Sequence, residues 1–232
     1  MSIDDTLLII RKNDFLAQLS DDDYVDLNIC HNFIIADRSA YIYFDAQCHN
    51  KLYFVKEGYV KIGNIDDDGN EIIKDILQPG DVFGQITLER NNMRGEFAQA
   101  YKVDTVLCAF TINDFEKLLM RRPDLGIVFS KKVGQQLRRI DHRLINLLQR
   151  DARTRILYFF WTILQHKLTA DTNSCKIENY FTHEDIARLT GTSRQTVTTM
   201  INQFAHDGLL QVDRKFIFFT DVKLLQREAH VG

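Results

Sequence analysis

Two groups of polar residues in this sequence have the types and spacing to do chemistry. The first lies in "FGQITLERNNMRGEFAQA", residues 83–100. Gly84 lets the backbone approach a ligand closely, and Arg94, ten residues later, supplies a charge that would neutralise a phosphate. These features predict an effector site made of Gly84, Gln85 and Arg94. Glu96 stands two residues beyond Arg94, and its carboxylate would repel a phosphate.

The second group lies in "TSRQTVTTMINQF", residues 192–204. Val197, Ile201 and Phe204 recur at steps of four and three, which predicts a helix with these side chains facing inward. The opposite face carries polar side chains that can hydrogen-bond base edges or phosphates, and none of them is negatively charged. The residues predicted to contact DNA are Ser193, Arg194, Gln195, Thr198, Thr199 and Asn202.

A second, shorter helix should precede this one. Thr182 and Asp185 have the spacing of a capping box, and Gly191 is free to take the positive φ of a turn between two helices. Downstream, "LLQV" and "KFIFF" flank a tight turn and predict a hairpin. Together these elements indicate a winged helix-turn-helix; an ordinary helical pair with a polar face is the alternative.

The first half of the chain reads as short strands. From about residue 30 to 111, apolar and polar residues alternate, and turn residues interrupt them at 57–58, 68–70 and 79–81. Many short strands at this spacing are typical of an antiparallel barrel or jelly roll. Residues 15–29 precede it and predict one or two short helices.

Residues 112–149 change to a helical period, and Pro123 suits the first turn of a long helix. Its apolar residues step by four and three, as in a coiled-coil seam, and predict dimerisation with a second copy. The predicted seam is Val133, Leu137, Ile140, Leu144 and Leu147. The alternative is that this stripe packs on the β domain of the same chain. Residues 152–168 predict a further amphipathic helix, whose aromatic run 158–161 should lie in a core.

Charge is distributed unevenly along the chain. Residues 1–120 carry a net charge of −10, residues 121–155 carry +7, and residues 156–232 are balanced. A basic segment favours contact with a polyanion. No apolar stretch is long enough to span a membrane, and the N-terminus lacks the pattern of a signal peptide, so we expect a cytoplasmic protein without a membrane partner.

The cysteines do not form a metal or disulfide pattern. The four are widely separated and include no Cys-x-x-Cys pair, so neither a disulfide framework nor an iron–sulfur cluster is expected. They are Cys30, Cys48, Cys108 and Cys175. Two Cys-His dipeptides, at 30–31 and 48–49, could meet around a metal, but neighbouring strand residues point to opposite faces. His49 and Cys108 remain open as axial ligands of a haem.

An enzyme built on the β domain is a second functional alternative. Metal-dependent oxygenases and isomerases on similar barrels need two or three converging His and a carboxylate. Residues 30–120 contain only His31 and His49. The sequence therefore favours a protein that is not an enzyme.

The stretches "LYFVKEGYVKI", "LQPGDVFGQ" and "LTGTSRQTVTTMINQF" resemble signature segments of the Crp/Fnr family, the catabolite-activator and fumarate-nitrate regulators. The resemblance covers nearly the whole chain. It implies an α+β fold: an antiparallel β-roll of the cyclic-nucleotide-binding type in residues 1–120, a dimerisation helix in 121–150 and a winged helix-turn-helix in 151–232. It further implies a homodimeric transcription regulator that binds a pseudo-palindromic site in double-stranded DNA and contacts RNA polymerase.

The resemblance also assigns roles to residues of the helix predicted in "TSRQTVTTMINQF", which would be the recognition helix, the helix that enters the major groove. Arg194 occupies the place of an arginine that reads guanine, whereas Gln195 stands where both main branches usually carry glutamate. Glutamine matches the N6 and N7 edge of adenine. Thr199 replaces a common arginine. We therefore expect a half-site that differs from both familiar ones.

Nucleotide-binding members resemble G-E-[aliphatic]-[small]-L followed by R-[ST]-A, and this chain departs from both parts. Gln85 replaces the glutamate, and alignment from the following strand places Gly95 and Glu96 at the arginine and the hydroxyl residue. Ile140 stands where the cyclic-AMP branch has a polar residue that touches adenine. No cofactor is therefore predicted, cyclic nucleotide included, and control by another effector or by abundance is expected. A nucleotide-sensing module that docks on another protein is the third alternative.

Overall fold

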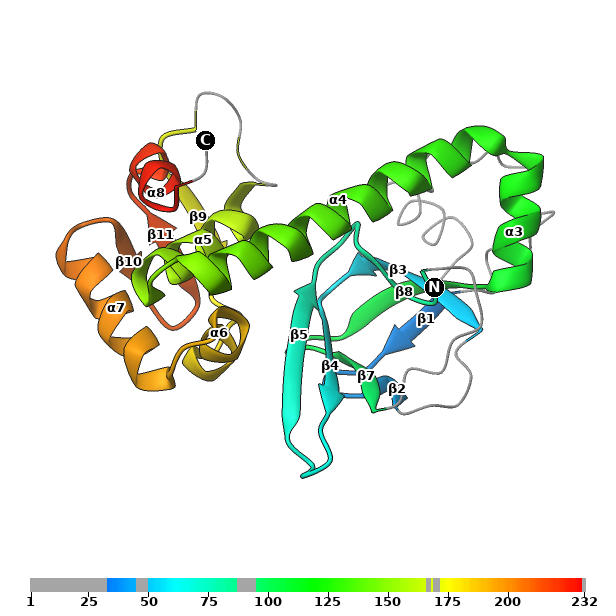
Figure 1. The fold of residues 1–232 in the computed structure, drawn as a ribbon, viewed down its shortest axis with the longest axis horizontal. Coiled ribbons are helices and arrows are strands. Elements are labelled where there is room, and N and C mark those ends of the chain that lie inside the picture. Colours follow the sequence, from blue (N-terminus) through cyan, green and yellow to red (C-terminus); the bar gives the residue numbers. More distant parts are fainter. Residues whose placement is uncertain (1–32, 45–49, 87–94, 166–167, 169–171, 231–232) are drawn as a thin grey trace. The chain divides into compact units, whose positions relative to one another are not determined.

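The computed structural model describes residues 33–44, 50–86, 95–165, 168 and 172–230 (Figure 1). The chain divides into two compact units, Met1–Arg138 and Arg139–Gly232, so the division falls inside the long helix α4 (Pro123–Gln149). The predicted helix at 15–29 and both Cys-His dipeptides lie outside the described residues.

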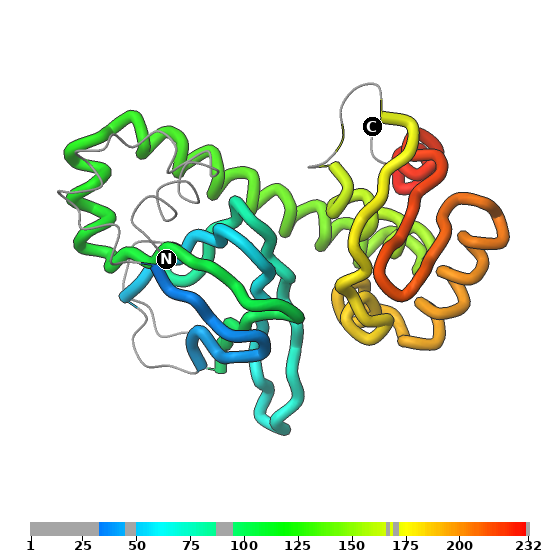
Figure 2. The backbone as a smooth tube through the Cα atoms, turned by 180° about the vertical axis from the view of Figure 1, so that it is seen from behind, coloured from blue at the N-terminus to red at the C-terminus, as the bar shows by residue number. Residues whose placement is uncertain are grey.

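The first unit contains two four-stranded sheets. One has the order β1 (Phe33–Ala36), β8 (Thr105–Thr111), β3 (Lys51–Glu57) and β6 (Val82–Gly84). The other has the order β2 (Tyr41–Phe44), β7 (Glu96–Ala100), β4 (Val60–Ile65) and β5 (Glu71–Leu77). All their pairings are antiparallel, and Figures 1 and 2 show the strands from opposite sides. The predicted antiparallel β-roll is confirmed.

The hairpin between β4 and β5 shows how local chemistry sets the strand register. The carboxylate of Asp66 accepts hydrogen bonds from the backbone N–H of Asn70 at 2.7 Å and of Asp68 at 3.0 Å. Hydrogen bonds from Asn70 hold the pKa of Asp66 below its usual value. The turn places Ile65 opposite Glu71, as the predicted break at 68–70 requires.

The β-roll has one core between its sheets and another on the outer face of the first sheet. The inter-sheet core takes residues from both sheets, among them Tyr43, Tyr53 and Phe83. The outer core is covered by α3 (Ile112–Arg121) and by the start of α4, whose Leu125 and Phe129 are buried in it. Alternation of side chains along each strand supplies both cores at once.

The apolar stripe of α4 changes its surroundings along the helix. Leu125, Phe129 and Val133 are spaced by four and pack on the outer core of the β-roll. Beyond them, the stripe is open to solvent, with exposed fractions of 66%, 58%, 54% and 37% for Leu137, Ile140, Leu144 and Leu147. Val133, the first residue of the predicted seam, is half-buried against the outer core of the β-roll, and the seam itself stays a prediction.

The second unit is built around helix α5 (Ala152–Leu164). It continues with β9 (Cys175–Glu178), α6 (His183–Thr190), α7 (Arg194–His206), β10 (Leu210–Val212), β11 (Phe216–Phe219) and α8 (Val222–Glu228). Phe160 is fully buried, and Tyr158, Phe159 and Trp161 pack against the same core, as predicted. The sheet order is β10-β11-β9. Among the described residues, no helix combines the length and apolarity needed to cross a bilayer.

Strand β9 is absent from the sequence-based expectations. Only Cys175 and Ile177 alternate as apolar residues in its four positions, which is too short a pattern to distinguish from a loop. The strand exists because its backbone pairs with β11, with Ile177 opposite Ile217. This pairing makes β11 the central strand of a three-stranded sheet, with β10 and β9 at its edges.

Gly84 provides a test of what the β-roll requires. Its φ is +86°, and a Cβ there would lie 2.6 Å from the carbonyl oxygen of Lys51. Gly69 has a similar φ of +84°, but a Cβ at Gly69 would have no atom within 4 Å. We expect Gly84→Ala to lower the free energy of unfolding by about 3 kcal/mol, and Gly69→Ala by about 1 kcal/mol. Urea denaturation of the full chain measures both; equal losses would contradict the steric argument.

Candidate nucleic-acid interface

Helices α6 and α7 are fixed by their end groups. Thr182 Oγ1 accepts the N–H of Asp185, and the Asp185 carboxylate accepts the N–H of Thr182, each at 3.1 Å. The predicted capping box is therefore present. Gly191 ends α6 with a φ of +61°, and Ser193 Oγ caps α7 by accepting the N–H of Thr196 at 3.0 Å. A very short turn thus sets the angle between the two helices.

Helix α7 buries the face that its sequence predicts. Val197, Ile201 and Phe204 are at most 5% exposed and belong to the core of the second unit. Ile186 and Ala187 of α6 lie in the same core. Packing against α6 therefore fixes which face of α7 remains outside.

The outward face of α7 carries Arg194, Gln195, Thr199 and Asn202, all of them exposed. They supply one cation and three uncharged side chains that hydrogen-bond, with no carboxylate among them. This composition suits the edges of base pairs in a major groove. The hydroxyl of Ser193 is exposed as well, but it already serves as the helix cap.

Thr198 stands apart from the other predicted contacts. Its hydroxyl donates to the carbonyl oxygen of Arg194 at 2.9 Å and lies 2.8 Å from Nδ1 of His183, the first residue of α6. A hydroxyl has one hydrogen, and the carbonyl takes it, so His183 donates its Nδ1–H to Thr198. The hydroxyl of Thr198 is therefore used to join α7 to the start of α6. Residue spacing alone did not reveal His183, because a different helix brings it there.

The wing between β10 and β11 presents two further cations. Its tip is Asp213, Arg214 and Lys215, and the Asp213 carboxylate accepts the N–H groups of Lys215 and Phe216 at 2.7 and 2.6 Å. These backbone hydrogen bonds hold the pKa of Asp213 below its usual value. Asn179 binds the backbone oxygens of Asp213 at 3.1 Å and of Lys215 at 2.8 Å. The tip is thus held in shape while both basic side chains are exposed.

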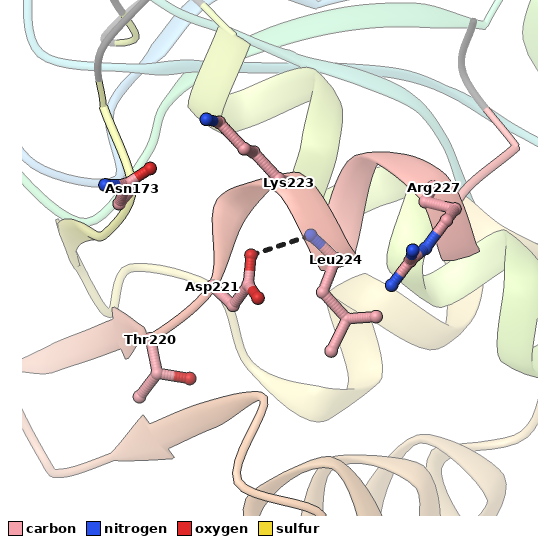
Figure 3. Close-up of a pocket in the computed structure, with 6 residues that line it drawn as sticks. All are labelled: Asn173, Thr220, Asp221, Lys223, Leu224 and Arg227. Atoms are coloured by element: carbon pink, nitrogen blue, oxygen red, sulfur yellow. Dashed lines mark hydrogen bonds between the residues drawn. The ribbon is translucent and has the colours of Figure 1, made fainter.

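A polar pocket of about 400 Å³ lies on another part of the second unit (Figure 3). Lys223 and Arg227 border it from α8, and the Asp221 carboxylate accepts the N–H of Leu224 at 2.8 Å and so caps that helix. The lining contains no pairing of a nucleophile with a base. Within the described part of the chain, no three His, Cys, Asp or Glu side chains gather to hold a metal ion.

The predicted effector segment is only partly described. Gly84 ends β6, where a positive φ is needed. Gln85 is buried, with 2% of the residue exposed, and its backbone N–H donates to the carbonyl oxygen of Lys51 at 3.0 Å. Arg94 lies outside the described residues. The fold alone therefore accounts for Gly84.

Glu96 is buried, and its carboxylate is fully engaged within the β-roll. Oε1 accepts the hydroxyl of Tyr43 at 2.8 Å, and Oε2 forms an ion pair with Lys74 Nζ at 2.7 Å. Burial raises the pKa of Tyr43 above its usual value, and the neighbouring Glu96 raises it further, so the phenol stays a hydrogen-bond donor. A negative charge thus stands inside the roll with its own partners.

Two further features of the β-roll interior lie near Glu96 and its partner Tyr43. Gly95 has a φ of +71°, and a Cβ there would lie 2.8 Å from the carbonyl oxygen of Ile65, so an arginine would be strained at this position. Tyr53 and Phe83 stack at 4.9 Å between ring centroids, and Tyr43 lies beside both in the inter-sheet core. Three aromatic side chains therefore pack together in the inter-sheet core.

An antiparallel β-roll, a long helix with an exposed apolar stripe and a winged helix-turn-helix with an exposed polar row define a DNA-binding regulator of the effector-domain type. The family model for the Crp-like helix-turn-helix domain matches residues 139–228. The model for the cyclic nucleotide-binding domain matches residues 37–122. The chain belongs to the Crp/Fnr family of transcription regulators.

Individual relatives agree with this assignment. A CRP-like cAMP-activated global transcriptional regulator of Mycobacterium tuberculosis is 25% identical over 81% of this chain and 84% of its own length. A cyclic AMP receptor protein of Thermus thermophilus is 27% identical over 81% and 83%. The structure of FixK2 from Bradyrhizobium japonicum superposes with a TM-score of 0.73 over 86% of this chain and 98% of that one, at 19% identity, and shows the shared fold.

The wing makes a prediction about salt dependence. We expect Arg214→Ala and Lys215→Ala each to weaken DNA binding about equally on all sequences, because contacts to phosphates carry no sequence information. Each should also reduce the slope of log K against log salt by about 1. Fluorescence anisotropy at several salt concentrations measures this. Lys223→Ala, which removes the same charge at the pocket on α8, is the control, and an equal change of slope there would contradict a role for the wing.

Proposed function

We propose that two copies of this chain bind one pseudo-palindromic site in double-stranded DNA, each placing α7 in a major groove. The observation that carries the proposal is the exposed row of Arg194, Gln195, Thr199 and Asn202. It lies on a helix whose other face is locked into the core, so these side chains are presented on a rigid support. The protein would act in the cytoplasm as a regulator and not as an enzyme.

The chemistry of the row supports a particular type of half-site. Arg194 stands in the first turn of α7, where a guanidinium can bind O6 and N7 of guanine with two hydrogen bonds. Gln195 can both donate and accept, which matches adenine. Thr199 is exposed but too short for a two-point contact with guanine. We therefore propose a half-site that differs from those of the two main branches of the family.

Dimerisation is supported by the second half of α4. Leu137, Ile140 and Leu144 are more than half exposed on one helix, and Ile145, Leu147 and Leu148 extend the apolar surface. A cluster of exposed apolar side chains favours burial in an interface. An apolar stripe along one helix can pack against the same stripe on a second copy of the chain. Two recognition helices joined in this way would reach half-sites about one helical turn apart, roughly 34 Å. Contact with RNA polymerase is proposed from membership of the family.

Control by something other than a cyclic nucleotide is supported by Glu96. Inside the β-roll, the Glu96 carboxylate is already paired with Tyr43 and Lys74. A phosphate that entered beside Glu96 would meet a like charge. An arginine at position 95 would be strained by the positive φ and by the nearby carbonyl of Ile65. We propose that another effector, or the amount of protein alone, regulates binding.

The direct test is selection from random DNA by the purified full chain, with and without cyclic nucleotides. The proposal expects two inverted copies of one half-site at a fixed separation, enriched equally under both conditions. A single unpaired motif, or no motif, would contradict binding as a dimer. The known half-site of either main branch would contradict the roles given to Gln195 and Thr199.

Arg194 allows a quantitative prediction. Arg194→Ala should weaken binding to the selected site by about 5- to 150-fold, since a two-point contact with guanine contributes about 1–3 kcal/mol. Binding to unrelated DNA should fall far less. Arg227→Ala removes the same charge from the pocket on α8 and should leave the preference for the selected site unchanged. Electrophoretic mobility shift on both DNAs gives the ratio, and sedimentation confirms that the oligomeric state is unaffected.

Cyclic AMP gives a second prediction. At about 1 mM, which would fill any site with a Kd below roughly 0.1 mM, it should change the affinity for the selected DNA less than about twofold. The reason is that a ligand without differential affinity for two states cannot shift them. The Thermus thermophilus cyclic AMP receptor protein serves as the positive control on its own site. A tenfold increase in DNA affinity would overturn this part of the proposal.

A further inference from the structure

Arg155 joins three segments of the second unit. It lies on α5, one turn after the Asp151 cap, and its guanidinium reaches away from its own helix. Nη2 donates to the carbonyl oxygen of Gly191 at 3.1 Å, and Nη1 donates to the carbonyl oxygen of Leu147 at 3.4 Å. Gly191 is the turn between α6 and α7, and Leu147 is in the last turn of α4. One side chain therefore links the end of the long helix to the turn that precedes the recognition helix.

Leu147 touches the same turn through its side chain. A Cβ at Gly191 would lie 2.8 Å from Leu147 Cδ2, so the Leu147 side chain lies directly against this turn and would have to shift if position 191 carried a side chain. Leu147 is therefore both the source of the carbonyl that Arg155 binds and an apolar partner of the turn. The turn at Gly191 is therefore held to the end of α4 by the hydrogen bonds of Arg155 and by the apolar contact of Leu147. Together these contacts restrict both translation and rotation of the turn relative to α4.

The guanidinium is suited to this position. The last four carbonyl groups of a helix lack partners within it, and Leu147 O is one of them. A planar fork of donors can satisfy that carbonyl and a second one at a fixed angle, which a lysine cannot do. Nε of Arg155 is buried, and no described residue accepts its hydrogen bond. The side chain thus gives up solvation at Nε while its two terminal nitrogens hold their partners.

The link spans a connection that is otherwise very short. Only Arg150 and Asp151 separate α4 from α5, and Asp151 is taken up in capping α5 by accepting the N–H of Thr154 at 2.8 Å. Rotation at these two residues would swing α5, and α6 and α7 packed on it, against the axis of α4. Arg155 and Leu147 bridge this connection on the side of the helix-turn-helix.

We propose that Arg155 is a positioning residue that fixes the direction of α7 relative to the end of α4 and thereby sets the spacing between half-sites. This inference rests on the proposed dimer. In a symmetric pair joined along α4, any swing of α7 is doubled between the two copies. One base pair is about 3.4 Å of DNA, so a small swing would admit a site one base pair longer or shorter.

The test compares binding to three DNAs that carry the selected half-sites at the selected spacing, one base pair shorter and one base pair longer. The wild-type chain should prefer the selected spacing at least about tenfold. Arg155→Met keeps the stem of the side chain and removes the donors, and it should reduce this preference to less than about threefold. The preferred half-site sequence should not change, because α7 itself is intact.

Arg153→Met is the matched control. Arg153 lies on the same helix, pairs with Glu228 at 2.6 Å and stacks over the ring of Phe204 at 5.2 Å, so its described contacts are with α8 and α7. It should retain the wild-type spacing preference even where it lowers stability. A purely structural role for Arg155 would weaken binding to all three DNAs alike, which would overturn the inference.

Arg155→Lys serves if the methionine variant does not fold. A lysine keeps the charge but replaces the planar fork by a single ammonium, so its spacing preference should fall between wild type and the methionine variant. An unchanged preference in either variant overturns the inference. Absence of any paired half-site for the wild-type chain would instead contradict the proposed dimer, so the two failures are distinguishable.

Discussion

The proposed dimer depends on one constraint, the apolar stripe that the second half of α4 leaves exposed. The helix begins by burying Leu125 and Phe129 on its own β-roll and then continues past it with Leu137, Ile140 and Leu144 open to water. A monomer has no described surface that covers them. Apolar area of this kind favours association, and association along α4 would place two recognition helices on one side of a DNA duplex. The β-roll therefore covers one part of the stripe and leaves the other part exposed.

The β-roll has the fold of an effector domain, but its interior differs from the nucleotide-binding pattern of the family at Glu96. Gly84 retains the positive φ that the roll needs, and the rings of Tyr43, Tyr53 and Phe83 pack together in the inter-sheet core. Glu96 introduces a charge that the protein itself neutralises through Tyr43 and Lys74. Burying a carboxylate is costly unless it is paired and hydrogen-bonded, and here both conditions are met. The Glu96 carboxylate therefore has both a hydrogen-bond donor and a cation beside it inside the β-roll.

The helix-turn-helix shows how few groups orient a recognition surface. A capping box starts α6, Gly191 turns the chain, and Ser193 starts α7, so each of these helix ends has a capping hydrogen bond. Thr198 and His183 then tie the two helices together across the outward side. Arg155 adds a tie to the end of α4. The exposed polar row is therefore held by neighbours that do not themselves need to touch DNA.

The sequence by itself predicted a β-roll, a long helix and a winged helix-turn-helix in that order. It also predicted the inward face of α7, the capping box and the turn glycines, because these follow from periodicity and from local hydrogen bonding. It further predicted that Arg194, Gln195, Thr199 and Asn202 lie on the outward face of α7, and that Glu96 departs from the family's nucleotide-binding pattern. Only the tertiary structure decided that Val133 packs on the β-roll, that β9 is a strand, that the hydroxyl of Thr198 is used by His183, and that Glu96 has Tyr43 and Lys74 as partners. Each of these depends on a residue brought from a distant part of the chain, and spacing along a single segment carries no information about which distant side chain will arrive.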